Sequence, residues 1–269
     1  MPSATWRSTW DWLLVTAAFV AALIFGVAVG NVLQGVPFHF DLNLRAYYTG
    51  GFFDLLNPFA ILCGLLSVTM IIMQGGYYLA SKTEDSMRKR AIAIARVMSL
   101  LVLFIFAGAG FWVMHLDSYV LIKSLGTAAP SNPLNKVVEI AAGAWLTNYA
   151  LYPLALTAPL LGFTGALLAP VFASIANSKI SLVMSSLSIF GIISTVGVSM
   201  FPFLLPSSSN PNMSLLVWDA SSSHFTLGLM LGATAIFLPI IVAYTSWVYR
   251  VMRGKVTVQS IKDEDKTMY

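Results

Sequence analysis

The side chains that could do chemistry in this sequence stand between its apolar runs rather than inside them. They are His39, Asp41, Arg45, Asp54, His115, Asp117, Glu139, Asp219 and His224. Three histidines could suggest a haem or a metal ion, because imidazole ligates both. Their spacing matches neither CxxC nor HExxH, and a haem ligand should lie within an apolar pocket. We therefore expect interfacial polar residues here, with no catalytic and no metal-binding residue in this chain.

A quinone headgroup is the one small molecule for which two residues can be named. Gln34 offers a hydrogen-bonding amide at the rim of the first apolar run, and Trp218 stands before the last run. Asp41 and Arg45 are four residues apart, so they could pair on one helical turn, or they could form a solvated surface pair that contributes little. No P-loop, dinucleotide fingerprint or assignable Ser/His/Asp constellation is present.

The elements that must position these residues are membrane helices. Of the residues, 58% are hydrophobic and only 10% are charged, with a mean hydropathy of +0.80, whereas a soluble domain has about a quarter charged residues. Six runs reach the roughly 20 apolar residues that a spanning helix needs. We place them at Asp11–Leu33, Phe59–Ala80, Ala91–Met114, Tyr149–Ala173, Ile180–Phe203 and Phe225–Val251. The runs lack the alternation of a membrane barrel, which predicts an all-α integral membrane protein with residues 1–269 forming a single membrane domain.

Charge predicts the orientation of these spans. The formal charge of +4 does not indicate nucleic acid, because the basic residues occupy short loops between the spans. One side holds Arg7, Lys82, Arg88, Lys89, Arg90, Arg96, Lys179, Arg250, Arg253, Lys255, Lys262 and Lys266. The other side holds Arg45, Lys123 and Lys136. The positive-inside rule then places both termini in the cytoplasm. The single Cys63 excludes a disulfide framework within the chain.

Small residues repeat every four positions in two runs. Gly26, Gly30 and Gln34 share one helix face, and His224, Gly228 and Gly232 share another. Such faces let a second helix approach closely. The fifth run has a hydroxyl face, for which packing through small side chains is favoured over a water path; its members are Ser181, Ser185, Ser188, Thr195 and Ser199.

The longest connection between the runs, 116–148, contains one further expected element. Its segment SNPL at 131–134 resembles a helix cap followed by proline in the first turn. The residues that follow, Val137, Val138, Ile140 and Ala141, would form a helix along the membrane surface or against a partner.

Several segments resemble subunit II of the cytochrome bd-type quinol oxidases, including the cyanide-insensitive branch. They are GNVLQGVPF at 30–38, YYTG at 47–50, LNPF at 56–59, SNPLNK at 131–136, GAWL at 143–146, MFPF at 200–203 and WDASS at 218–222. They keep the order of that subunit. The resemblance implies a respiratory complex of a bacterial cytoplasmic membrane that oxidises quinol and reduces oxygen to water.

The resemblance also implies how the work is divided. Haems b and d belong to subunit I, and this subunit packs beside it as a structural counterpart that can hold a structural quinone. The expected partners are subunit I, membrane lipid, quinone and a small accessory subunit, with a pseudo-repeated four-helix-bundle architecture. The family has about three further N-terminal spans, so the chain corresponds to its C-terminal two-thirds. Arg45, Asp54, Trp145 and Asp219 would order the outer rim.

Two other classes of protein remain open from the residues. A transporter or permease subunit would place its binding residues at mid-membrane on broken helices, whereas the centres of these runs carry no charge. A structural assembly factor would need no cofactor at all. Co-purification with a haem-bearing partner separates these alternatives from an oxidase subunit.

Overall fold

The structure, a computed structural model, describes residues 4–124, 132–175, 177–251 and 254. Six of its helical segments are long and apolar enough to cross a membrane. They are α1 (Ala4–Gln34), α2 (Pro58–Lys82), α3 (Asp85–Val113), Pro153–Ser174 including α5 (Thr157–Ser174), α6 (Ser178–Met200) and α8 (His224–Val251). The prediction of a six-helix, all-α membrane protein is therefore confirmed.

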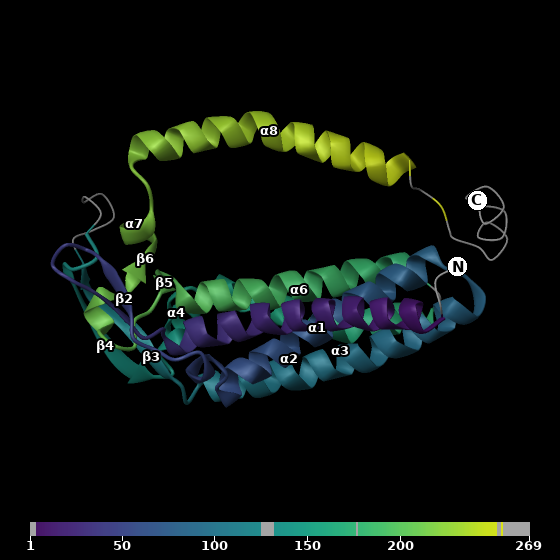
Figure 1. Cartoon of the computed structure of the whole chain (residues 1–269), viewed down its shortest axis with the longest axis horizontal. Coiled ribbons are helices and arrows are strands. Elements are labelled where there is room, and N and C mark those ends of the chain that lie inside the picture. Colours follow the sequence, from purple (N-terminus) through teal and green to yellow (C-terminus); the bar gives the residue numbers. More distant parts are fainter. Residues whose placement is uncertain (1–3, 125–131, 176, 252–253, 255–269) are drawn as a thin grey trace.

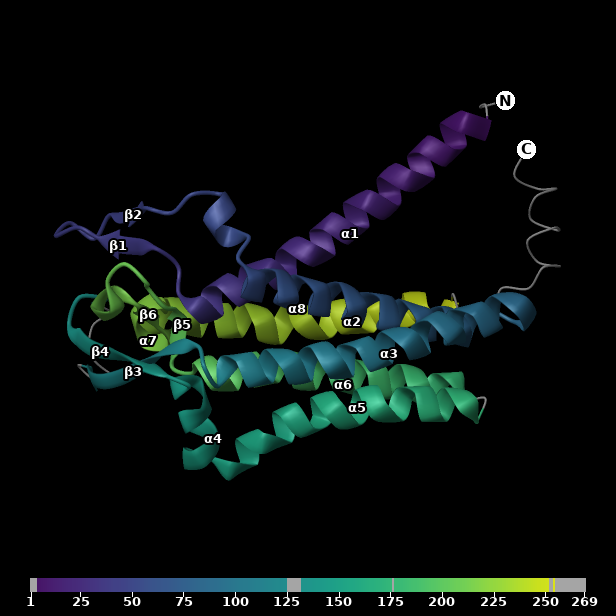
Figure 2. The same cartoon turned by 90° about the horizontal axis from the view of Figure 1, so that it is seen from below.

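Four of the spans close into a bundle. α2 packs against α3 and α6, and α5 packs against the same two helices (Figures 1 and 2). Connections of only a few residues join α2 to α3 and α5 to α6, and each of these pairs is antiparallel (Figure 2). The shared core includes Met73 and Tyr77 of α2, Val102 of α3, Ala166 of α5 and Ile192 of α6.

The hydroxyl face of α6 is a packing surface of this bundle. Ser181, Ser185 and Ser188 are fully buried. Ser188 Oγ donates a hydrogen bond of 2.8 Å to the carbonyl of Gly162 in α5, and Ser185 Oγ donates one of 2.5 Å to Gln74 Oε1 in α2. Hydroxyls that bond across helices satisfy themselves without water.

Helix α1 approaches the bundle through its C-terminal half. Its N-terminal half diverges from α2 (Figure 2), and its buried positions begin at Ala22. A Cβ atom at Gly26 would lie 2.7 Å from the Cα atom of Gly64, and one at Gly30 would lie 2.6 Å from the Cα atom of Ala60. Glycine is therefore what lets the two backbones meet.

Helix α8 stands apart from the bundle. It follows the short α7 (Val217–Ala220), runs back along the length of the molecule (Figure 1) and buries none of its residues. Nothing described in the chain lies within 4 Å of a Cβ atom placed at Gly228 or Gly232. Any close approach at these two glycines must come from outside the described part of this chain.

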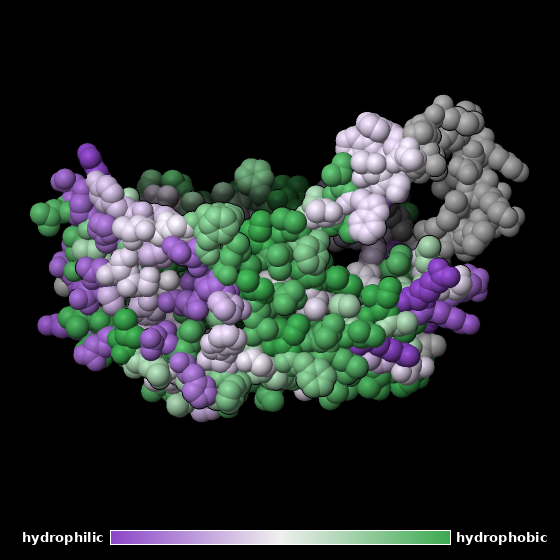
Figure 3. All heavy atoms as spheres, turned by 60° about the horizontal axis from the view of Figure 1, so that its bottom comes forward, coloured by the Kyte–Doolittle hydropathy of each residue, from purple (hydrophilic) through white to green (hydrophobic). Residues whose placement is uncertain are grey.

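The connections at one end of the bundle form three small antiparallel sheets, and we call this the sheet end. The strand pairs are β1 (Phe38–Phe40) with β2 (Ala46–Tyr48), β3 (Asp117–Ser124) with β4 (Lys136–Ala142), and β5 (Phe203–Leu205) with β6 (Leu215–Leu216). Short helical turns lie among them: η1 (Phe53–Leu55), η2 (Ala144–Leu146), α4 (Thr147–Leu151), η3 (Pro153–Leu156) and η4 (Pro211–Met213). An apolar band separates the sheet end from a second polar end (Figure 3).

The prediction of a helix after Pro133 is wrong, because residues 136–142 form strand β4. Lys136 and Val138 are buried whereas Val137 and Glu139 are exposed, which is the alternation of a strand. Pairing with β3 decides the matter, since Tyr119 lies opposite Ile140 in the register. β-Branched residues favour such pairing. Ser131, the expected cap, lies outside the described residues.

Two further expectations are corrected in part. The fourth span does not run unbroken from Tyr149, because α4 ends at Leu151 and Tyr152 leaves helical geometry before Pro153. Asp41 and Arg45 share no helical turn either. They lie in the β1–β2 turn, where Asp41 Oδ1 accepts hydrogen bonds from the backbone N–H groups of Asn43 and Arg45 at 2.9 and 2.8 Å.

Candidate functional site at the sheet end

Helix α1 ends beneath the sheets on side chains from the β3–β4 region. Gly35 has φ +89°, which lets the chain turn out of the helix, and a Cβ atom there would overlap the hydroxyl of Tyr119. Tyr119 donates a hydrogen bond of 3.3 Å to the carbonyl of Gln34. Trp145 Nε1 donates one of 3.0 Å to the carbonyl of Leu33. Two carbonyls left open by the last turn of α1 are thus satisfied.

These two donors belong to an aromatic cluster with Phe203. The ring centroids of Tyr119 and Trp145 are 5.9 Å apart, and that of Phe203 lies 5.8 Å from Trp145. Trp145 is fully buried. Burial raises the pKa of the Tyr119 hydroxyl to about 12, and the nearby Asp117 carboxylate adds to the rise. The cluster joins α1, β3, η2 and β5 into one unit.

A cavity of about 230 Å³ opens beside the end of α1. Its lining residues are Asn31, Gln34, Gly35, Val36, Pro37, Tyr48, Asp54, Leu55 and Asn57. One wall is an asparagine pair, in which Asn57 Nδ2 donates a hydrogen bond of 3.0 Å to Asn31 Oδ1. Asn31 Nδ2 in turn donates one of 2.7 Å to the carbonyl of Leu55, and Asn57 Oδ1 accepts from the Ala60 N–H in the first turn of α2. This wall is therefore built and held by its own hydrogen bonds.

Gln34 supplies the unsatisfied group of the cavity. Its side-chain Oε1 is buried and has no hydrogen-bond partner. Asp54 also lines the cavity, and its Oδ2 accepts a hydrogen bond of 2.7 Å from the Gly51 N–H. A buried amide oxygen without a donor is unfavourable by about 1–3 kcal/mol. The cavity can therefore favour a small polar molecule that presents a hydrogen-bond donor to Gln34.

Trp218, the second residue expected to contact a quinone, lies elsewhere. It is half-buried on α7 and packs against the core that contains Tyr119, Trp145 and Phe203. It is not among the residues that line the cavity at Gln34. The structure therefore does not bring Gln34 and Trp218 into one site.

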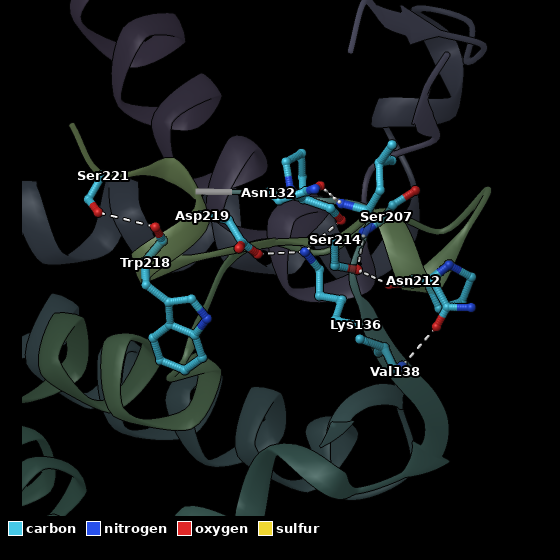
Figure 4. Close-up of polar contacts among 12 residues, drawn as sticks. Asn132, Lys136, Val138, Ser207, Asn212, Ser214, Trp218, Asp219 and Ser221 are labelled. Atoms are coloured by element: carbon cyan, nitrogen blue, oxygen red, sulfur yellow. Dashed lines mark hydrogen bonds and ion pairs between the residues drawn. The ribbon is translucent and has the colours of Figure 1, made fainter. Parts of the chain in front are cut away.

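A buried ion pair joins α7 to the first residue of β4 (Figure 4). Lys136 Nζ lies 2.5 Å from Asp219 Oδ2, and the two side chains are 1% and 8% exposed. Lys136 Nζ also donates a hydrogen bond of 2.8 Å to the carbonyl of Pro133. Nearby, Asn212 Oδ1 accepts a hydrogen bond of 2.8 Å from the Val138 N–H. Sequence reasoning named Asp219 as a rim residue and counted Lys136 only among the outer basic residues, so it did not pair the two.

The other expected rim residues do not converge. Arg45 is exposed, and its backbone N–H and carbonyl hydrogen-bond with Asp41. His39 stacks on Tyr47 with a centroid distance of 5.6 Å. His115 Nδ1 lies 3.1 Å from the carbonyl of Phe111, and His224 is exposed at the start of α8. Within the described residues, no three His, Cys, Asp or Glu side chains gather as a metal site would require. The histidines do not fit a haem, which needs its ligand inside an apolar pocket.

Comparisons with known proteins agree on one family. The family model for "Cytochrome bd terminal oxidase subunit II" matches residues 1–252. The chain is 45% identical to "Cytochrome bd-I ubiquinol oxidase subunit 2" of Escherichia coli K12, over 98% of this chain and 70% of that protein. It is 43% identical to "Probable cytochrome oxidase subunit 2" of Haemophilus influenzae over the same shares. With "Cytochrome bd ubiquinol oxidase subunit 2" of Bacillus subtilis the identity is 21%, over 94% of this chain.

These matches bear on the alternatives that the residues left open. They give no support to a transporter or permease. They extend across the membrane helices and the sheet end together, and the resemblance drawn from segments such as 30–38 and 218–222 is confirmed. The chain belongs to the family of cytochrome bd terminal oxidase subunit II.

Proposed function

We propose that this chain is the scaffold partner of the haem-bearing subunit I in a quinol:oxygen oxidoreductase of a bacterial respiratory membrane. The observation behind the proposal is α8, an apolar helix of 28 residues that buries none of them within its own chain. A helix in lipid gains little from lipid alone and is positioned by packing against other helices. Family membership supplies the identity of the neighbour, since the relatives are named as subunits of cytochrome bd ubiquinol oxidases.

Co-purification tests this proposal. A tagged copy of the chain should bring down a haem-bearing polypeptide whose reduced-minus-oxidised spectrum shows b and d bands. A pigmented preparation that contains this chain alone would contradict the assignment of the haems to subunit I. A colourless preparation from respiring membranes would contradict the partnership itself.

Basic residues support an orientation with the sheet end on the outer side. Lys82, Arg88, Lys89, Arg90 and Lys179 lie at the opposite end of the bundle, at the α2–α3 and α5–α6 turns. We call this the basic end. By the positive-inside rule it faces the cytoplasm, as would the start of α1 and the end of α8. Labelling a cysteine introduced at the exposed Asn43 with a membrane-impermeant reagent in intact cells tests this orientation, because only an outer sheet end should react.

The cavity at Gln34 is proposed as the place where a quinone headgroup docks. The unsatisfied Gln34 Oε1 would accept a hydrogen bond from a quinol hydroxyl, and the amide nitrogen of the same side chain would donate to a quinone carbonyl after rotation. Tyr48 and Asp54 add polar atoms to the lining. When bound, the quinone would supply two-electron redox chemistry, whereas this chain's residues only hold and orient it.

A Gln34→Leu variant of the assembled complex tests the quinone proposal. Quinone extracted from the purified variant should fall severalfold relative to the parent, because the headgroup loses its hydrogen-bonding partner. Asn43→Ala, at an exposed position of the β1–β2 turn, is the matched control and should keep its quinone. Unchanged quinone content in Gln34→Leu would reject this site without affecting the partnership with subunit I.

A further inference from the structure

At the basic end, two arginines of α3 reach towards the turn that joins α5 to α6. Arg88 and Arg96 are eight residues apart, which is about two helical turns, so they share one face of α3. Arg88 Nη2 donates a hydrogen bond of 3.1 Å to Ser178 Oγ, at the first residue of α6. Arg96 Nη2 donates one of 2.9 Å to Ser174 Oγ, at the last residue of α5. Both guanidinium groups thus lie against the same turn.

The hydrogen-bonding capacity of Arg96 is not filled by this contact. Its Nε atom is buried and has no hydrogen-bond partner. Ser174 is a neutral acceptor, and its own hydroxyl donates a hydrogen bond of 3.0 Å to the carbonyl of Pro170. A guanidinium has five N–H donors and a permanent charge, so a single hydroxyl leaves both the donors and the charge under-satisfied.

The surroundings are strongly positive. The basic residues of segments 82–96 and 174–180 are Lys82, Arg88, Lys89, Arg90, Arg96 and Lys179, whereas Glu84 and Asp85 are their acidic residues. Helix α6 also points its N-terminus at this turn, where Asn177 caps the N–H of Ile180. A helix N-terminus carries partial positive charge and favours anions. The field at the turn therefore selects a negatively charged ligand.

The depth of Arg96 indicates which anion can reach it. From Arg96 to Val113, at the sheet end of α3, the helix rises about 26 Å at 1.5 Å per residue. The hydrocarbon core of a bilayer is roughly 30 Å thick. When the sheet end of α3 lies at one membrane surface, Arg96 therefore lies at the opposite headgroup layer, beside the phosphates of that leaflet.

We propose that Arg96, assisted by Arg88 and Lys179, binds the phosphate of an anionic phospholipid in the leaflet at the basic end. The planar fork of arginine matches the oxygens of a phosphate diester with paired hydrogen bonds. The negative charge of the headgroup balances the excess of basic side chains around the α5–α6 turn. The acyl chains lie along the apolar outer surfaces of α3 and α5. The bound lipid thereby joins three helices of the bundle at the end that has no sheet.

Native mass spectrometry of the assembled complex containing this chain tests the proposal. The parent should retain added phosphatidylglycerol but not phosphatidylcholine, and Arg96→Gln should weaken retention by about tenfold. Arg90→Gln removes the same charge from an exposed position of the same helix and is the matched control. Equal loss in both variants would show a diffuse surface charge effect and overturn the site.

Two further arms separate the sources of phosphate and guard against misfolding. Inorganic phosphate in excess should leave lipid retention unchanged, and effective competition would overturn the choice of a lipid over a free anion. Arg96→Lys keeps the charge but lacks the planar fork, so it should assemble and weaken retention less than Arg96→Gln does. Retention by Arg96→Lys and Arg96→Gln equal to that of the parent would overturn the role of Arg96.

Discussion

Lys136 Nζ and Asp219 Oδ2 meet at 2.5 Å across 83 residues of sequence, with both side chains nearly excluded from solvent. The pair joins α7 to the start of β4, and α8 follows α7 after a short connection. The charge pair, together with the hydrogen bond from Lys136 to the carbonyl of Pro133, therefore helps to fix the place where the last helix leaves the sheet end.

Removing one member of this pair should destabilise the fold strongly. Lys136→Met leaves the Asp219 carboxylate buried without its cation, for which the penalty is about 3–5 kcal/mol. The thermal unfolding midpoint of the purified complex should fall clearly, whereas Lys123→Met, at an exposed position of β3, should change it little. The double variant Lys136→Met/Asp219→Leu should be less destabilised than Lys136→Met alone. Equal midpoints for Lys136→Met and Lys123→Met would contradict the role of the pair.

The close contact between α1 and α2 should depend on glycine, which has no side chain beyond hydrogen, at positions 26 and 30. Gly26→Ala places a methyl group against the backbone of Gly64, and such overpacking destabilises by about 1–3 kcal/mol. Gly108→Ala is the matched control, because nothing described lies within 4 Å of its added Cβ atom. Gly108→Ala should be neutral or slightly stabilising, since alanine favours helix over glycine. The measurement is again the unfolding midpoint, and similar values for the two variants would contradict the close approach.

Alkaline pH should loosen the sheet end through Tyr119. Burial and Asp117 raise the pKa of its hydroxyl from 10.0 to about 12, so the fold favours the neutral phenol. That contribution is fully present below pH 10 and is lost as the pH rises from 10 through 12. The stability advantage of the parent over Tyr119→Phe should therefore shrink across this window. A constant difference between the two proteins from pH 9 to pH 12 would refute the shift.

Asp117 provides a second measurement on the same hydroxyl. Asp117→Asn removes the negative charge that disfavours ionisation of the Tyr119 hydroxyl, so the pKa of Tyr119 should be lower than in the parent. The loss of stability at alkaline pH should therefore be complete at a lower pH. The absorbance of tyrosinate near 295 nm, read as a difference from the corresponding Tyr119→Phe protein, follows this titration. An unchanged titration would leave burial as the sole cause of the shift.

The glycines of α8 should matter for assembly rather than for the fold of this chain. Leucine at both Gly228 and Gly232 meets nothing within the described part of the chain, yet it would block a partner helix that approaches this face. The doubly substituted chain should insert normally but recover much less haem-bearing partner on co-purification. Thr234→Leu, on nearly the opposite face of the helix, is the control. Full recovery by the double variant would place the partner interface elsewhere.

Much of the fold could be predicted because its signals are long and local. Each span is a run of apolar residues, and the four-residue spacing of the glycines at 26 and 30 predicts a close helix contact. The β3–β4 ribbon could not be predicted in this way. Its second strand, β4, forms because it pairs with residues 117–124, and this pairing is not visible in the local sequence. The proline at 133 instead resembles the start of a helix.

The candidate site follows the same division. Gln34 is visible as a polar residue at a helix end, but its oxygen lacks a donor because the nearby Asn31 and Asn57 amides donate elsewhere, Asn57 to Asn31 and Asn31 to the carbonyl of Leu55. Trp218 looked similar in the sequence, and only packing assigns it to a different cluster. Lys136 was hidden for another reason, because its carboxylate partner lies far along the chain.

The closed bundle of α2, α3, α5 and α6 determines what the molecule would lose on proteolysis. Each of these four helices packs against other helices of the same chain, whereas α8 is connected to the rest of the chain through the exposed stretch Ser221–Ser223. Proteolytic cleavage in this stretch would remove α8 and leave the four-helix bundle folded. The chain would then lose its binding to other subunits before it lost its fold.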